Sequence, residues 1–121
     1  IFERALGPWN PEKVEAFCDQ YICSGGHLAE LALGRDRFVL DARKLVCEKL
    51  GARSPLCCRP YDLCCALIAT EAGCVVADPF GRPLNAPLDT TTNLAWAGYA
   101  NQKLAALLQP IVREEIERVL G

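Results

Sequence analysis

The sequence predicts an α/β domain, in which helices are layered on both faces of a central mixed sheet (an α/β/α arrangement). Short apolar runs of strand length alternate along the chain with segments of helical periodicity, which is the order typical of layered folds. The composition, 51% hydrophobic and 23% charged over 121 residues, is that of a globular domain. We therefore expect residues 1–121 to form a single domain.

The first helix is predicted to begin at Asn10, because a capping Asn is followed there by Pro and an acidic residue. Its apolar residues recur at the spacing of one helix face, namely Val14, Phe17, Cys18 and Tyr21.

Three glycine and serine residues, Ser24-Gly25-Gly26, interrupt this pattern and precede a second predicted helix over 27–33. The apolar run over 37–40 predicts a strand that ends at Asp41. Residues 44–59 are mixed in character and contain Gly and Pro, so we expect a long surface connection there.

Residues 61–72 are nearly continuously apolar and of helical length, with Pro60 before them and Gly73 after them. We expect a helix that is covered on most sides. The elements expected after it are a short strand over 74–77, a turn over 78–81, a strand over 94–99, and a terminal helix capped by Asn101 and kinked or split at Pro110.

Eight cysteines lie mostly in apolar segments. Because Cys packs as a small hydrophobe, free thiols in a cytoplasmic compartment are the preferred interpretation. A disulfide framework and a structural metal site are the alternatives. Neither has a sequence signature, since the chain has no CxxC pair and His27 is its only histidine.

The charge and hydropathy patterns argue against two classes of partner. A net charge of −2 gives no electrostatic signal for a nucleic-acid polymer. No apolar run reaches the roughly 18 residues of a membrane-spanning helix, and no signal-peptide pattern is present. We therefore expect neither nucleic acid nor a membrane as a partner.

Asp62, at the start of the apolar run over 61–72, has two interpretations. It is either a carboxylate that satisfies the free N–H groups of a helix N-terminus, or a ligand for a hard divalent cation. Asp41 and Arg43 close a predicted strand at an edge where α/β folds place ligands, and the guanidinium of Arg43 or Arg59 could bind a phosphate or a carboxylate at two points. Solvated surface charges are the alternative for these three residues.

The segments around Asp62 resemble a known family. Tyr61-Asp62, Ile68 and Glu71-Ala72-Gly73, followed by a short strand, resemble the second signature of the inositol monophosphatase family, an aromatic-Asp pair opening a helix that ends in Glu-Ala-Gly. Tyr61 stands where Trp is commoner, and Cys74 where a second Gly is usual. The upstream helix and strand to Asp41, and the downstream strands and terminal helix, extend the likeness over most of the chain.

The resemblance implies the C-terminal half of a sugar-phosphatase-like fold. It implies a Mg²⁺-dependent phosphatase acting on small phosphomonoesters such as inositol, sugar or nucleotide phosphates. Asp62 would bind a metal ion, and metal ions in such a site clamp the phosphate and activate a water molecule. Ser24, at a helix start, would contact the substrate, with helix capping as the alternative. Glu71 is expected to be structural.

The remaining metal ligands of the family lie in its N-terminal half. Because the chain begins with Ile1 and contains no Met, we expect a fragment or a processed chain whose partner is that missing half. A homodimer is left open, since a face exposed by the missing half favours self-association. The alternative function is a non-catalytic binding or assembly module that retains the fold.

Overall fold

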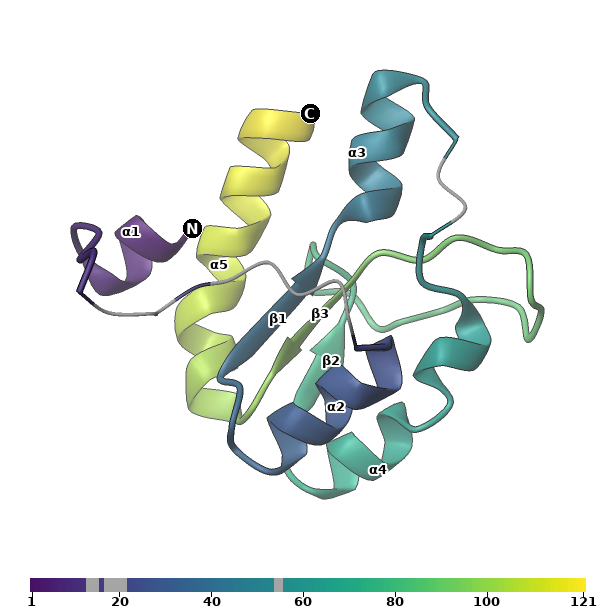
Figure 1. Cartoon of the computed structure of the whole chain (residues 1–121), viewed down its shortest axis with the longest axis horizontal. Coiled ribbons are helices and arrows are strands. Elements are labelled where there is room, and N and C mark those ends of the chain that lie inside the picture. Colours follow the sequence, from purple (N-terminus) through teal and green to yellow (C-terminus); the bar gives the residue numbers. More distant parts are fainter. Residues whose placement is uncertain (13–15, 17–21, 54–55) are drawn as a thin grey trace.

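A computed structural model of the chain describes residues 1–12, 16, 22–53 and 56–121. Within these residues the chain is of mixed α/β type, with five α-helices, one 3-10 turn (η1) and three strands (Figure 1). The helix predicted from Asn10 lies largely outside the described residues. The described start of that segment does show the side chain of Asn10 accepting a hydrogen bond from the Glu12 N–H at 2.9 Å.

The three strands form one antiparallel sheet in the order β1-β3-β2. The strands are β1 (Phe38–Asp41), β2 (Val75–Ala77) and β3 (Trp96–Tyr99), each within one or two residues of its predicted place. The sheet therefore differs from the expected mixed one, because both of its described strand pairs are antiparallel. Strand β3 is central and buried along its whole length.

The two faces of β3 meet different helices, because side chains alternate along a strand. Trp96 packs in one cluster with Leu28 and Leu31 of α2 (Ser24–Ala32) and with Ala69 of α4 (Ala66–Glu71). Ala97 and Tyr99 pack instead against α5 (Gln102–Leu120). Figure 1 shows α2 and α4 together on one side of the sheet, with the long α5 beside it.

The terminal helix α5 is continuous through Pro110, so the expected split is absent. It begins where the Asn101 side chain accepts a hydrogen bond from the Leu104 N–H at 3.0 Å, as predicted. Its buried residues continue on both sides of the proline and hold both halves of the helix against the core; they are Ala105, Leu108, Val112 and Ile116. Pro110 itself is exposed.

The surface connection predicted over 44–59 is wrong in its first part, which forms α3 (Arg43–Leu50). This helix ends at Gly51, whose φ of 61° is in the left-handed region that favours glycine. No residue of α3 is fully buried. Its apolar residues are few and lie among charged ones, so the segment resembles a mixed connection in the sequence.

The apolar segment over 61–72 is also different from the expectation. It is divided into η1 (Pro60–Leu63) and α4, and of these two elements only Leu63 and Ala69 are buried. Leu67 and Ile68 are 70% and 71% exposed, so the prediction of a helix covered on most sides is wrong. The predicted glycine end is confirmed, since Gly73 follows α4 with a φ of 97°.

An N-terminal helix, α1 (Phe2–Leu6), is held to α5 by ion pairs and to β1 by ring packing. Arg4 pairs with Glu114 at 2.6 Å and with Glu115 at 2.8 Å. The Phe2 ring meets the edge of Phe38 on β1, with ring centroids 6.1 Å apart. This helix has no signature in the sequence, because it is short and has no buried residue.

Glu115 on α5, which binds both Arg118 and Arg4, makes this part of the fold sensitive to acid. Hydrogen bonds from Arg118 and then from Arg4 lower the pKa of Glu115 from 4.5 to about 2. Because the folded-state pKa is depressed, this stabilisation is present above pH 4.5 and is lost as the pH falls toward 2.

The variant Glu115→Gln tests this contact. In the wild type the urea concentration at the midpoint of unfolding should fall as the pH is lowered from 4.5 toward 2, and in Glu115→Gln it should fall less. Glu117→Gln, which removes an exposed pair with Arg113 on the same helix, is the control and is expected to leave the decline unchanged. Equal declines in the wild type and Glu115→Gln would contradict this assignment.

Candidate functional site

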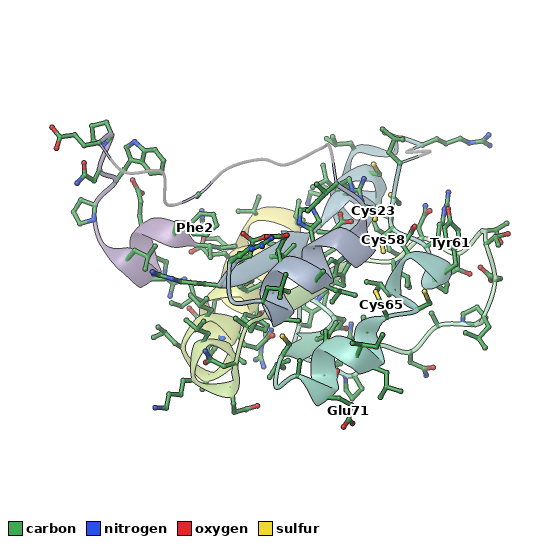
Figure 2. The ribbon with its side chains drawn as sticks, turned by 60° about the horizontal axis from the view of Figure 1, so that its bottom comes forward. Phe2, Cys23, Cys58, Tyr61, Cys65 and Glu71 are labelled. Carbon is green, nitrogen blue, oxygen red and sulfur yellow. The ribbon has the colours of Figure 1, made fainter. Side chains whose placement is uncertain are left out.

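The predicted site residues lie around the buried segment Cys57-Cys58, which leads directly into η1. The carbonyl of Cys58 accepts a hydrogen bond from the Leu94 N–H at 2.8 Å, in an isolated antiparallel bridge. This bridge brings the connection between β2 and β3 alongside η1. Figure 2 shows Cys58 close to Cys23, Cys65 and Tyr61, while Glu71 lies away from them at the far end of α4.

Ser24 is the first residue of α2 and is buried. Its hydroxyl lies 3.4 Å from the Cys58 Sγ and donates a hydrogen bond to it. The hydroxyl makes no capping hydrogen bond within α2, where the residue preceding the helix is Cys23. The helix-capping interpretation of Ser24 is therefore wrong, and its hydroxyl instead ties α2 to the segment that precedes Asp62.

Asp62 lies in η1 and is half-buried. Its Oδ2 accepts a hydrogen bond from the Arg59 backbone N–H at 2.8 Å, so the carboxylate caps the first turn of η1. Within the described part of the chain, its Oδ1 accepts no hydrogen bond. The hydrogen bond to Oδ2 thus fixes the position of the carboxylate, and Oδ1 keeps its capacity to accept a further hydrogen bond or bind a cation.

Arg59 fastens η1 to the connection between β2 and β3. Its Nη1 donates hydrogen bonds to the carbonyl of Thr91 and to the side chain of Asn93. The same connection is shaped by Asp89, whose pKa is lowered by hydrogen bonds from the side chain and backbone of Thr92. The Arg59 guanidinium is therefore engaged by the protein itself.

Asp41 and Arg43 form a pair at the end of β1. The Asp41 carboxylate accepts hydrogen bonds from Arg43 Nε at 2.8 Å and Nη2 at 2.5 Å, a two-point contact. This pair raises the pKa of the Arg43 guanidinium, with the Asp41 hydrogen bond as the main cause. The Asp41 side chain is nearly buried, whereas half of the Arg43 side chain is exposed. Arg43 Nη1 makes no hydrogen bond to any described residue.

The pKa of the Cys58 thiol is shifted by several of the predicted site residues. Burial raises the pKa of its thiol to about 11, and the Ser24 hydrogen bond acts in the opposite direction. The charges of Asp41 and Asp62 raise this pKa further, and Arg43 lowers it. Because such interactions fall off with distance, these charges lie near one thiol. The fold therefore brings residues from α2, β1, α3 and η1 near the Cys58 thiol.

The described residues do not complete a metal site. Across residues 1–12, 16, 22–53 and 56–121, no group of three or more His, Cys, Asp or Glu side chains is arranged to hold a metal ion. Two hollows lie elsewhere. One of about 340 Å³ lies between α3, the segment after β2 and the residues just before β3, and one of about 300 Å³ lies between α3, α5 and Phe80. Neither is lined by Asp62 or Ser24. The candidate site is thus a cluster of polar side chains around Cys58, outside both hollows.

Sequence reasoning missed Cys58, Thr91 and Asn93 as parts of this cluster. Cys58 was recognisable only as the neighbour of Arg59, and Thr91 only as part of a polar loop. The long-range bridge that places both beside η1 has no sequence signal. His27 is half-buried on α2, and its Nδ1 has no hydrogen-bond partner among the described residues.

Comparisons with protein-family models, with curated proteins and with solved structures each gave no match to this chain. Among the described residues, no helix combines the length and the apolar character required to cross a membrane. The seven described cysteines are free thiols, and Cys18 lies outside the described residues.

Proposed function

We propose that this chain is the C-terminal part of a Mg²⁺-dependent phosphatase of small phosphomonoesters, related to the inositol monophosphatases. The observation that supports the proposal is the hydrogen bonding of the Asp62 carboxylate. One of its oxygens is fixed by the Arg59 N–H, and the other accepts no hydrogen bond from a described residue. A carboxylate oxygen held in this way is suited to a hard cation such as Mg²⁺. The motif Tyr61-Asp62 to Gly73 that suggested the role begins at this position.

The proposal requires further ligands from polypeptide outside these 121 residues, because one carboxylate does not hold Mg²⁺. The proposed N-terminal half would also add strands to the sheet and make it the mixed sheet that the sequence predicts. β1 and β2 are the edge strands of the described sheet, so strands added in parallel would make it mixed within an α/β/α arrangement. A cytoplasmic location belongs to the same proposal and is supported by the free thiols.

The cluster favours different roles for the two arginines. Arg59 is already bound to Thr91 and Asn93, so we assign it to positioning the loop beside Asp62. Arg43 is half-exposed and has an Nη1 group without a partner among the described residues, so it is the better candidate to contact a substrate phosphate. The Ser24 hydroxyl would have to leave the Cys58 thiol in order to contact a substrate.

A non-catalytic binding or assembly module is the second candidate function. One observation favours it: Asp41 and Arg43 bind each other, Arg59 binds the neighbouring loop, and Ser24 binds Cys58. Polar groups that satisfy one another in this way maintain a fold without any ligand.

Phosphatase assays distinguish the two candidates. The full-length polypeptide should hydrolyse at least one inositol, sugar or nucleotide monophosphate with Mg²⁺, and EDTA should abolish the release of phosphate. The isolated 121 residues should be inactive while showing the circular dichroism of a folded α/β chain. A folded full-length polypeptide that releases no phosphate from such a panel would favour the module.

A further inference from the structure

Two cysteine thiols lie near the same glycine, Gly25, at the start of α2. A Cβ atom placed on Gly25 would lie 3.4 Å from the Cys65 Sγ and 3.9 Å from the Cys23 Sγ. Both sulfurs are therefore within van der Waals reach of the same point, which is open because Gly25 has no side chain. The two cysteines come from different elements, since Cys23 immediately precedes α2 and Cys65 immediately precedes α4 (Figure 2).

The two thiols are also more accessible to solvent than the three buried cysteines. Cys23 is exposed and Cys65 is half-buried, whereas Cys57, Cys58 and Cys74 are at most 5% exposed. The Cys58 thiol is further occupied by its hydrogen bond from Ser24. A small reagent can therefore reach Cys23 directly, and Cys65 lies beside it to complete a second step.

We propose that Cys23 and Cys65 form a reversible disulfide when the protein meets a small organic disulfide such as oxidised glutathione. The Cys23 thiolate attacks one sulfur of the reagent, which forms a mixed disulfide and releases one thiolate. The Cys65 thiolate then attacks the Cys23 Sγ and releases the second thiolate. The protein thiols lose two electrons and two protons, and the reagent leaves as two thiols. The bond requires the two side chains to rotate until the sulfurs are about 2 Å apart.

The disulfide would act on the candidate site, and this consequence rests on the proposed function. Cys23 is adjacent to Ser24, and Cys65 lies three residues after Asp62. The same point above Gly25 is 3.8 Å from the Asp62 carbonyl oxygen, so α2 and η1 are already in close contact there. A bond between the two cysteines would fix Ser24 relative to Asp62 and restrict movement of the Ser24 hydroxyl away from Cys58.

Peptide mapping tests the disulfide without any enzyme assay. The folded protein is treated with oxidised glutathione, its remaining thiols are alkylated, and cross-linked peptides are sequenced by tandem mass spectrometry. We expect a link between Cys23 and Cys65 that dithiothreitol removes. A native-like oxidised protein without this link, or one linked through Cys64 or Cys18 instead, would overturn the proposal.

Variants separate the two steps of the reaction. Cys65→Ser should accumulate a stable glutathione adduct on Cys23, because the second thiolate is absent. Cys64→Ser, which removes the adjacent exposed thiol, is the matched control and should form the disulfide at the wild-type rate. Gly25→Ala should form it several-fold more slowly, because its methyl group occupies the space between the sulfurs. If Cys65→Ser lost its glutathione adduct as fast as Cys64→Ser, Cys65 would not be the thiol that attacks the mixed disulfide, and the proposal would be overturned.

Activity measurements test separately whether the disulfide affects the candidate site. If the full-length polypeptide is a phosphatase, oxidation should lower its turnover reversibly in the wild type and leave Cys65→Ser much less affected. A mapped disulfide in a protein without phosphatase activity would reject the proposed function and keep the redox site. An active phosphatase in which Cys23 and Cys65 remain unlinked would do the reverse.

Discussion

On the proposed function, replacing Asp62 with asparagine is expected to lower phosphatase turnover of the full-length polypeptide by at least ~100-fold, because the proposed metal ligand loses its charge. The side-chain oxygen of asparagine still accepts the hydrogen bond from the Arg59 N–H, so the cap of η1 is retained. The free energy of unfolding should therefore change by less than about 1 kcal/mol. Turnover with saturating Mg²⁺ and urea unfolding together measure the two effects.

Asp78→Asn is the matched control for this variant. Asp78 also caps a turn, since its Oδ1 accepts hydrogen bonds from the Phe80 and Arg82 N–H groups at 2.9 and 2.8 Å. It lies in the turn after β2, away from the cluster around Cys58, so its replacement should leave turnover nearly unchanged. If Asp62→Asn instead retained its turnover and lost stability, the carboxylate would have only the capping role.

Replacing Trp96 with alanine is expected to reduce the free energy of unfolding by about 3–5 kcal/mol. Trp96 is 0% exposed and packs with Leu28 and Leu31 on the α2 face of the sheet. Its ring also occupies the space above Gly98, where a Cβ would lie 2.8 Å from the Trp96 Cζ3. Since small domains are stable by only about 5–15 kcal/mol, this change removes a large share of the stability. Urea unfolding followed by far-UV circular dichroism measures the loss.

Trp9→Ala is the matched control, because Trp9 is 52% exposed and belongs to neither core cluster. Its replacement should change the unfolding free energy by roughly 0.5 kcal/mol or less, as for other surface substitutions. Similar losses for the two tryptophans would show that β3 is not the centre of the core.

The strands and the terminal helix were predictable because each has a strong local signal. Residues 37–40, 74–77 and 94–99 are short apolar runs, and Asn101 precedes a clear amphipathic pattern. The wrong expectation for residues 61–72 has a physical cause. Apolar content alone does not show whether a segment is covered, so Leu67 and Ile68 were expected to be buried and are exposed.

The order of the strands could not be predicted, because β1 and β2 both pair with β3 through contacts distant in sequence. The same limit applies to the candidate site. Asp62, Ser24, Asp41, Arg43 and Arg59 were recognisable by residue type and by their places at element ends. Their actual partners, such as Cys58 for Ser24 and Asn93 for Arg59, depend on tertiary contacts that have no sequence periodicity.

The position of a bound cation tests the role of Asp62 most directly. Mn²⁺ is paramagnetic and broadens the NMR signals of nearby nuclei, so it can replace Mg²⁺ as a probe in the full-length polypeptide. We predict broadening of the backbone amide signals of Asp62, Cys58 and Ser24, and its loss in Asp62→Asn but not in Asp78→Asn. Broadening that is absent from these residues, or that persists unchanged in Asp62→Asn, would contradict a metal-binding role for this carboxylate.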